Sequence, residues 1–209
     1  MHAPRFENFD QNRYSGKEYE FDLLGKLDTE NPAFRAELKK LQEAAVNRGY
    51  HPKQADSLPF REAVALSKKF QPSDPTNPVR EFAKELRLAL ADKLGLESDE
   101  QLDKLKIFTT LGGPLDAHGV DGFVSFICAV GNGGEREVLV SFDVTKNPNK
   151  DEAPKAAELL IGGDIPDPGD ENYKEEEYLK IIDGYAGKMS EILQGKMQQG
   201  QMGSGETLH

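Results

Sequence analysis

The sequence contains no tryptophan, a single cysteine and no apolar run of about 18 residues. A transmembrane helix needs about 20 mostly apolar residues, so no membrane span is expected. The lone Cys128 cannot form a disulfide within the chain, and we expect it to be a small buried residue inside a strand. The first 22 residues are polar and lack the apolar segment of a secretory signal. The expected compartment is therefore the cytoplasm.

Basic residues are scarce relative to acids, with 26 Lys and Arg against 37 Asp and Glu and a net charge of −11. Most of the excess lies after residue 150, where 13 acids face five bases. Strong non-specific binding of nucleic acid needs clustered Lys and Arg that neutralise phosphates, and the overall balance argues against it. A local basic groove is still compatible with this composition.

The central pattern consists of two apolar, β-like segments, residues 121–130 and 137–145, joined by a glycine-rich turn. Glycines in the turn allow the positive φ of a tight reversal. The segments are rich in Val, Phe, Ile and Leu, so they predict an antiparallel hairpin with most side chains buried. A hairpin brings the start of one strand beside the end of the other. Asp121 and Asp143 are therefore expected to be neighbours.

Helical patterns surround this hairpin. Two predicted helices begin with the same pair, an asparagine that can cap and a proline that suits the first turn, at Asn31-Pro32 and Asn77-Pro78. Residues 156–161 fit either a short strand or a helical turn. We expect helices at residues 31–49, 58–70, 77–95 and 175–193, and strands at residues 105–111, 121–130 and 137–145.

The order of these elements predicts an α+β or α/β fold, in which helices flank a small mixed β-sheet with the antiparallel hairpin at its centre. We expect an N-terminal arm and helical extension at residues 1–72, an α/β core domain at 73–195 and a disordered tail at 196–209. Prolines between residues 72 and 78 mark the first boundary. The polar, glycine-rich composition marks the tail.

The second strand of the hairpin has one apolar face and one mixed face, because successive side chains alternate. Asp143 lies on the mixed face together with Thr145. Two carboxylates that lie close together repel each other, and a cation or a lysine removes that repulsion. If Asp121 points to the same side as Asp143, the two acids can share a hard cation such as Mg²⁺.

A known family has acids in a similar arrangement. Gly119-Val120-Asp121 opens one strand, and Phe142-Asp143-Val144-Thr145-Lys146 ends the next, after a helix and a first strand. Over roughly residues 77–165 this order resembles the PD-(D/E)xK nuclease superfamily. The resemblance implies that Asp121 and Asp143 bind Mg²⁺ or Mn²⁺ and that Lys146 positions or activates the attacking water. It also implies help from a glutamate on the preceding helix, either Glu81 or Glu85.

The lysine departs from the family pattern. Thr145, rather than a lysine, stands two residues after Asp143. On a regular strand Lys146 would point to the opposite face. A bulge at the strand end, or Lys150 reaching back from the turn, would restore a lysine beside the acids. This departure concerns the hydrolytic step, and the two acids can still bind a metal ion without the lysine.

Other residues compete for the same roles. Asp116 follows Pro114-Leu115 and is an alternative to Asp121 as the first acid. His118 can bind metal or act as a base, or it can simply be exposed in a loop. Asp121 can instead cap a turn at the start of its strand.

Asp143 also has an alternative reading, because an acid in an apolar strand needs a partner. Lys146 or Arg136 can supply one as a purely structural pair. Two functions therefore stay open. One is a metal-dependent, nuclease-like phosphodiester hydrolase that takes nucleic acid in a local groove. The other is a non-catalytic module of the same fold that binds another protein through its N-terminal helices and its acidic C-terminal helix.

Overall fold

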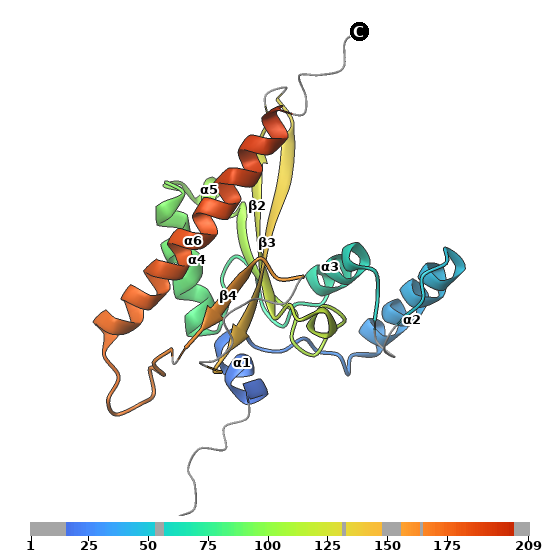
Figure 1. The fold of residues 1–209 in the computed structure, drawn as a ribbon, viewed down its shortest axis with the longest axis horizontal. Helices are drawn as coiled ribbons and strands as arrows, with labels where there is room; N and C mark the ends of the chain where they lie inside the picture. The colour runs from blue at the N-terminus through green and yellow to red at the C-terminus, as the bar shows by residue number, and fades with distance from the viewer. Residues whose placement is uncertain (1–15, 53–56, 131–132, 148–155, 164, 203–209) are drawn as a thin grey trace, which may run out of the picture.

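The structure, a computed structural model, describes residues 16–52, 57–130, 133–147, 156–163 and 165–202 (Figure 1). It has the predicted α+β class, with helices around a four-stranded mixed sheet. The elements in chain order are α1 (Gly16–Leu24), α2 (Pro32–Asn47), α3 (Phe60–Lys69), α4 (Glu81–Lys93), α5 (Asp99–Leu102), β1 (Leu105–Thr109), the 3-10 helix η1 (Asp116–His118), β2 (Gly122–Ala129), β3 (Glu135–Thr145), β4 (Leu159–Gly162) and α6 (Glu175–Met202).

The strands lie in the order β1-β2-β3-β4. Both β1 with β2 and β2 with β3 are antiparallel, whereas β4 is parallel to β3. The predicted hairpin is thus confirmed as β2 and β3, in the register that pairs Gly122 with Phe142. Gly133 has a φ of 74°, as the turn requires, while residues 131 and 132 lie outside the described residues. Residues 156–161, for which the sequence allowed a short strand or a helical turn, include the first residues of strand β4.

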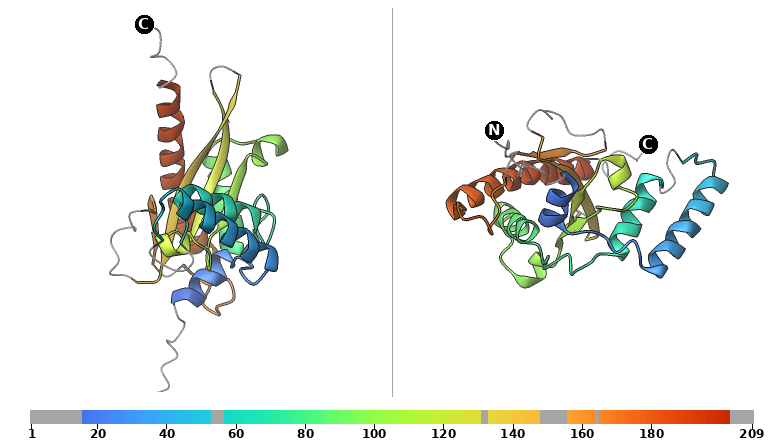
Figure 2. Two further views of the ribbon diagram at one scale, coloured as in Figure 1. Left: turned by 90° about the vertical axis from the view of Figure 1, so that its right-hand side faces the viewer. Right: turned by 90° about the horizontal axis from the view of Figure 1, so that it is seen from below.

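Each face of the sheet carries its own hydrophobic cluster. Helices α4 and α6 cover one face, and α3 with α2 lies beyond the other (Figures 1 and 2). Phe108 and Phe123 stack on the second face with ring centroids 4.8 Å apart. The first face receives the apolar residues of β3, as the alternation predicts: Val138, Val140, Phe142 and Val144.

Of the two helix starts predicted at an Asn-Pro pair, one is confirmed and the other is wrong. Helix α2 begins at Pro32, and the Asn31 side chain accepts a hydrogen bond from Ala33 N at 2.9 Å. Helix α4 begins at Glu81 rather than at the predicted Pro78, with Arg80 as its cap residue. Residues 79 and 80 form a bend, and Arg80 has an extended backbone with φ −82° and ψ 128°, so the predicted start there was wrong.

Two ends of the chain differ from the prediction. The arm before α2 contains the helix α1. Its residues Tyr19 and Leu24 are buried in the hydrophobic cluster between the sheet and helices α4 and α6. Helix α6 continues to Met202, so residues 196–202 are helical and not a disordered tail. Arg136 Nη2 donates to the carbonyl oxygen of Lys196 at 2.7 Å, which ties this end of the helix to β3. Residues 203–209 lie outside the described residues.

The N-terminal extension contacts the core on both sides of the sheet. Helix α1 packs with α4, and α3 packs with β1. The division into an extension at residues 1–72 and a core at residues 73–195 stays a prediction, because these contacts cross it. Within the described ranges, no helix is both long and apolar enough to cross a membrane.

Candidate functional site

The two buried acids lie at the same end of the hairpin. Asp121 directly precedes β2, and Asp143 lies two residues before the end of β3. Because Gly122 pairs with Phe142, the register places Asp121 and Asp143 as the next residues on facing strands. Their residual exposures are only 4% and 5%. The sequence correctly predicts that these acids are neighbours.

Asp121 extends the β-ladder by one residue before the start of β2. Its backbone N donates to Phe142 O at 3.0 Å, and its carbonyl oxygen accepts from Thr110 N at 2.9 Å. Its carboxylate Oδ2 accepts from the backbone N of Val144 at 2.7 Å. The carboxylate thus stands where the next backbone acceptor would be. The carboxylate therefore has a structural role across the two strands rather than as the cap of a local turn, and the hydrogen bond fixes it beside β3.

Burial raises the pKa of the Asp121 carboxyl to about 7. The hydrogen bond from Val144 N acts in the opposite direction, and the charges of Glu20, Asp143 and Asp116 raise the pKa further. Negative charge is therefore costly at this position near neutral pH. A proton compensates that cost, and a nearby divalent cation would compensate it as well.

The donor set suits a hard cation that keeps other ligands. Mg²⁺ usually binds through one or two carboxylates and retains several waters or substrate oxygens. Asp121 and Asp143 can supply the two carboxylates. Over the part of the chain that the structure describes, no three His, Cys, Asp or Glu side chains gather closely enough to hold a metal ion. A cation here would therefore depend on water or on a substrate phosphate for most of its ligands.

The basic end of β3 contacts helix α1. Lys146 Nζ lies 5.7 Å from the centroid of the Tyr19 ring, and the Tyr19 hydroxyl donates to Gly163 O at 2.9 Å. Thr145 shares the face of Asp143 and accepts a hydrogen bond from Asn147 N at 3.2 Å. Lys150, the alternative lysine, lies outside the described residues.

The secondary candidates have structural partners. Asp116 Oδ2 accepts from Gly112 N at 3.0 Å and lies 3.8 Å from Lys17 Nζ. His118 Nε2 lies 2.9 Å from Leu58 O, and since a carbonyl only accepts, this nitrogen carries the proton. The charge of Asp116 still raises the pKa of Asp121. Nε2 of His118, in contrast, is already used in its hydrogen bond to Leu58 O.

The two glutamates of α4 lie on the other side of the sheet. The buried residues of helix α4 belong to the same cluster as the apolar face of β3, opposite the face that carries Asp143. Glu81 lines a cavity of about 450 Å³ together with Tyr19 and Tyr178. The assisting role expected for Glu81 or Glu85 gains no support from this position.

The proposed pairing of Asp143 with Arg136 is wrong. Arg136 lies near the opposite end of β3, and its guanidinium donates to the carbonyl oxygens of Lys196 and Met197. The contact between α1 and the region of Asp121 and Asp143 was not predicted from the sequence. Glu20 and Tyr19 reach this region from a helix with little amphipathic pattern, so only tertiary packing places them there.

No family model matches this chain, and no curated protein or solved structure shows significant similarity to it. The function must therefore be inferred from the residues themselves.

Proposed function

We propose that the chain is a metal-dependent phosphodiester hydrolase of the nuclease type, with Asp121 and Asp143 as the residues that hold Mg²⁺ or Mn²⁺. The observation that carries this proposal is the pair of buried carboxylates at one end of the hairpin, one of them fixed by the hydrogen bond from Val144 N. Such a pair destabilises the fold unless a proton or a cation compensates it.

The arrangement of elements supports the same function. Helix α4, strand β1, Asp121 before β2 and Asp143 near the end of β3 follow the order on which the likeness to the PD-(D/E)xK superfamily rests. When bound, the cation would polarise a phosphoryl oxygen and lower the pKa of a coordinated water. Asp121 and Asp143 hold that charge in place. The ammonium of Lys146 adds positive charge at the end of β3, where a phosphate would be attracted.

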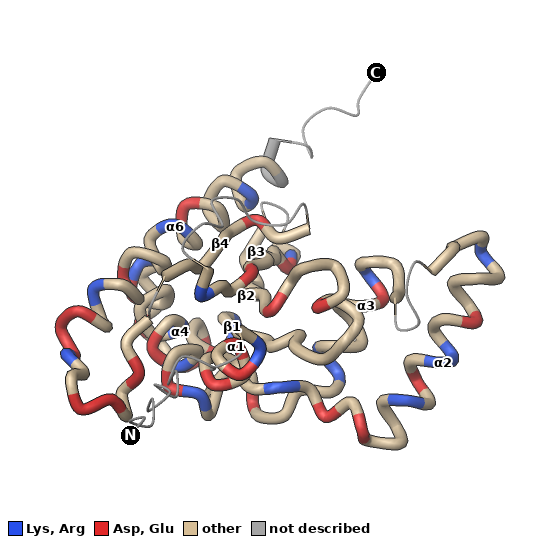
Figure 3. Tube along the Cα trace, turned by 60° about the horizontal axis from the view of Figure 1, so that its bottom comes forward, with Lys and Arg blue, Asp and Glu red and all other residues tan. Residues whose placement is uncertain are grey.

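A second function has its own support. Thr145 occupies the family's lysine position, and the first turn of α6 carries Glu175, Glu176 and Glu177 in an acidic stretch (Figure 3). The exposed Leu179 follows this stretch on the same helix. A non-catalytic module would use this acidic surface to bind a basic protein partner.

A plasmid-nicking assay tests the hydrolase. We expect the wild type to convert supercoiled DNA to open circles with Mg²⁺ or Mn²⁺ and not with EDTA. Asp143→Asn is expected to lower the rate by about 100-fold or more, because one of two carboxylate ligands is lost. Asp92→Asn, an exposed change on α4 with the same loss of charge, is the control and should retain the wild-type rate.

Two results would count against catalysis. One is a wild type that nicks with neither cation. The other is equal nicking by wild type and Asp143→Asn, which would indicate a contaminating nuclease. Either result would favour the non-catalytic module.

A further inference from the structure

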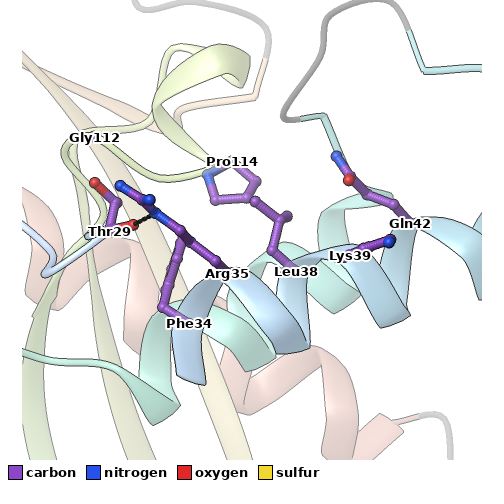
Figure 4. A pocket seen from close by; sticks show the side chains of 8 residues that line it. All are labelled: Thr29, Phe34, Arg35, Leu38, Lys39, Gln42, Gly112 and Pro114. Atoms are coloured by element: carbon purple, nitrogen blue, oxygen red, sulfur yellow. Dashed lines mark hydrogen bonds between the residues drawn. The ribbon is translucent and has the colours of Figure 1, made fainter. Parts of the chain in front are cut away.

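A cavity of about 390 Å³ lies between α2 and the loop that follows β1 (Figure 4). We propose that it binds a phosphate group of a nucleic-acid strand whose neighbouring phosphates reach Asp121 and Asp143. The inference rests on the proposed function and adds to it a second contact for the substrate, away from the acid pair. The lining residues are Thr29, Phe34, Arg35, Leu38, Lys39, Gln42, Gly112 and Pro114.

Two cations form the rim on the α2 side. Arg35 and Lys39 are four residues apart, so they lie one above the other on one helix face. Both are exposed, and neither forms an ion pair with any residue that the structure describes. Arg35 Nε donates to Thr29 O at 3.2 Å, which orients the guanidinium at one end of the pocket (Figure 4). A guanidinium held in this way is suited to the oxygens of a phosphate.

A third cation, Lys26, lies beside the lining residue Gly112 without lining the cavity itself. A Cβ built on Gly112 would lie 3.1 Å from Cε of Lys26, so the lysine stem lies against this glycine. Lys26 Nζ lies 5.5 Å from the centroid of the Phe21 ring. Two cations thus line one cavity, and a third lies next to it, in a chain with a net charge of −11. This is the local basic site that the overall composition still allowed.

The neighbouring acids do not cancel this charge. Glu37 on α2 pairs with Lys69 of α3 at 3.4 Å. Asp116 accepts from Gly112 N and lies near Lys17. No carboxylate is among the residues that line the cavity. An anionic ligand is therefore favoured over a cationic or neutral one.

One loop joins the pocket to the acid pair. Gly112 lines the pocket, and its backbone N donates to Asp116, whose charge acts on Asp121. At the start of the loop, Thr110 N donates to the carbonyl oxygen of Asp121. The same loop of about ten residues therefore lines the pocket and contacts Asp121. A ligand that contacts both must extend beyond one phosphate, as a nucleic-acid strand does.

Binding without hydrolysis tests this inference. We would measure fluorescence anisotropy of a labelled single-stranded DNA of about 12 nucleotides on the Asp143→Asn background in EDTA. Adding Arg35→Ala and Lys39→Ala is expected to weaken binding by about 10-fold or more and to reduce the salt dependence by about one to two released ions. The matched control adds Lys40→Ala and Lys84→Ala, two exposed lysines with the same total charge loss, and should change binding by less than about threefold.

The outcomes separate the alternatives. Equal weakening by both double variants would overturn the pocket in favour of diffuse charge, and so would a background protein that binds no DNA. DNA that binds no more tightly than inorganic phosphate or AMP would overturn the nucleic-acid strand as ligand. Binding that depends on Arg35 and Lys39 supports the inference even if the nicking assay fails, and that failure would then overturn only the hydrolase.

Discussion

Replacing Asp121 with asparagine is expected to remove most of the fall in stability between about pH 5 and pH 8. In the wild type, burial raises the pKa of this carboxyl from 3.8 to about 7. Between those values the native state keeps a proton that the unfolded chain releases, so the free energy of unfolding declines as the pH rises. Since one pKa unit corresponds to about 1.4 kcal/mol, the decline over this range is roughly 2 to 3 kcal/mol.

The asparagine variant isolates the charge from the hydrogen bond. Its amide oxygen can still accept from Val144 N, so the hydrogen bond to β3 just before the start of β2 is kept. Urea unfolding at several pH values, without divalent cations, measures the effect. The exposed change Asp92→Asn should leave the wild-type profile unaltered. Parallel profiles for Asp121→Asn and wild type would show that burial of this carboxylate carries no such cost.

Gly122→Ala is expected to destabilise the protein by about 3 kcal/mol or more. A Cβ at this position would lie 2.5 Å from Cζ of Phe142 and 3.0 Å from the carbonyl oxygen of Phe108. The Phe142 ring is fully buried, so it has no open space to enter. The packing of this ring on Gly122 holds the start of β2 against β3. The same contact therefore positions Asp121.

Gly184→Ala provides the matched control for this change. Gly184 lies on the exposed side of α6, and a Cβ there would meet nothing within 4 Å. In a helix, alanine is favoured over glycine by about 1 kcal/mol, so this variant should be slightly more stable than wild type. Chemical denaturation of both variants measures the contrast. A Gly122→Ala protein as stable as wild type would show that the ring does not pack on the strand as described.

The hairpin was predictable because its information is local. Val140, Phe142 and Val144 alternate with Ser141, Asp143 and Thr145, and glycines supply the turn. The Asn31-Pro32 start of α2 is local for the same reason. The short helix α5 also had a readable signal. The Ser98 hydroxyl accepts from Gln101 N, and the Gln101 amide oxygen accepts from Ser98 N, which is the capping box.

The missed features depend on contacts between distant segments. The last turns of α6 are polar, but Lys196 Nζ donates to Leu139 O at 2.6 Å and the helix end accepts from Arg136. The start of α4 moves to Glu81 even though Asn77-Pro78 offers the usual local signal. Contacts with β3 thus accompany the longer α6, whereas the local signal at Asn77-Pro78 does not set the start of α4.

The candidate site shows the same division. Facing positions on a hairpin follow from register, so the proximity of Asp121 and Asp143 was predictable. Repulsion between the two carboxylates was predictable as well, but the largest cause of the raised pKa of Asp121, its burial, was not, and neither was the charge of Glu20 from α1. The cationic pocket also joins α2 to a loop more than 70 residues later in the chain. The spacing of residues in the sequence does not predict that contact.

The central claim is that Asp121 and Asp143 together hold a divalent cation, and calorimetric titration with Mn²⁺ tests it most directly. The wild type should bind one ion, more tightly near pH 8 than near pH 6, because the ion competes with the proton on Asp121. Asp121→Asn and Asp143→Asn should each weaken binding by about 10-fold or more, whereas Asp116→Asn should change it by less than about threefold. Equal binding by wild type and Asp143→Asn would contradict the claim.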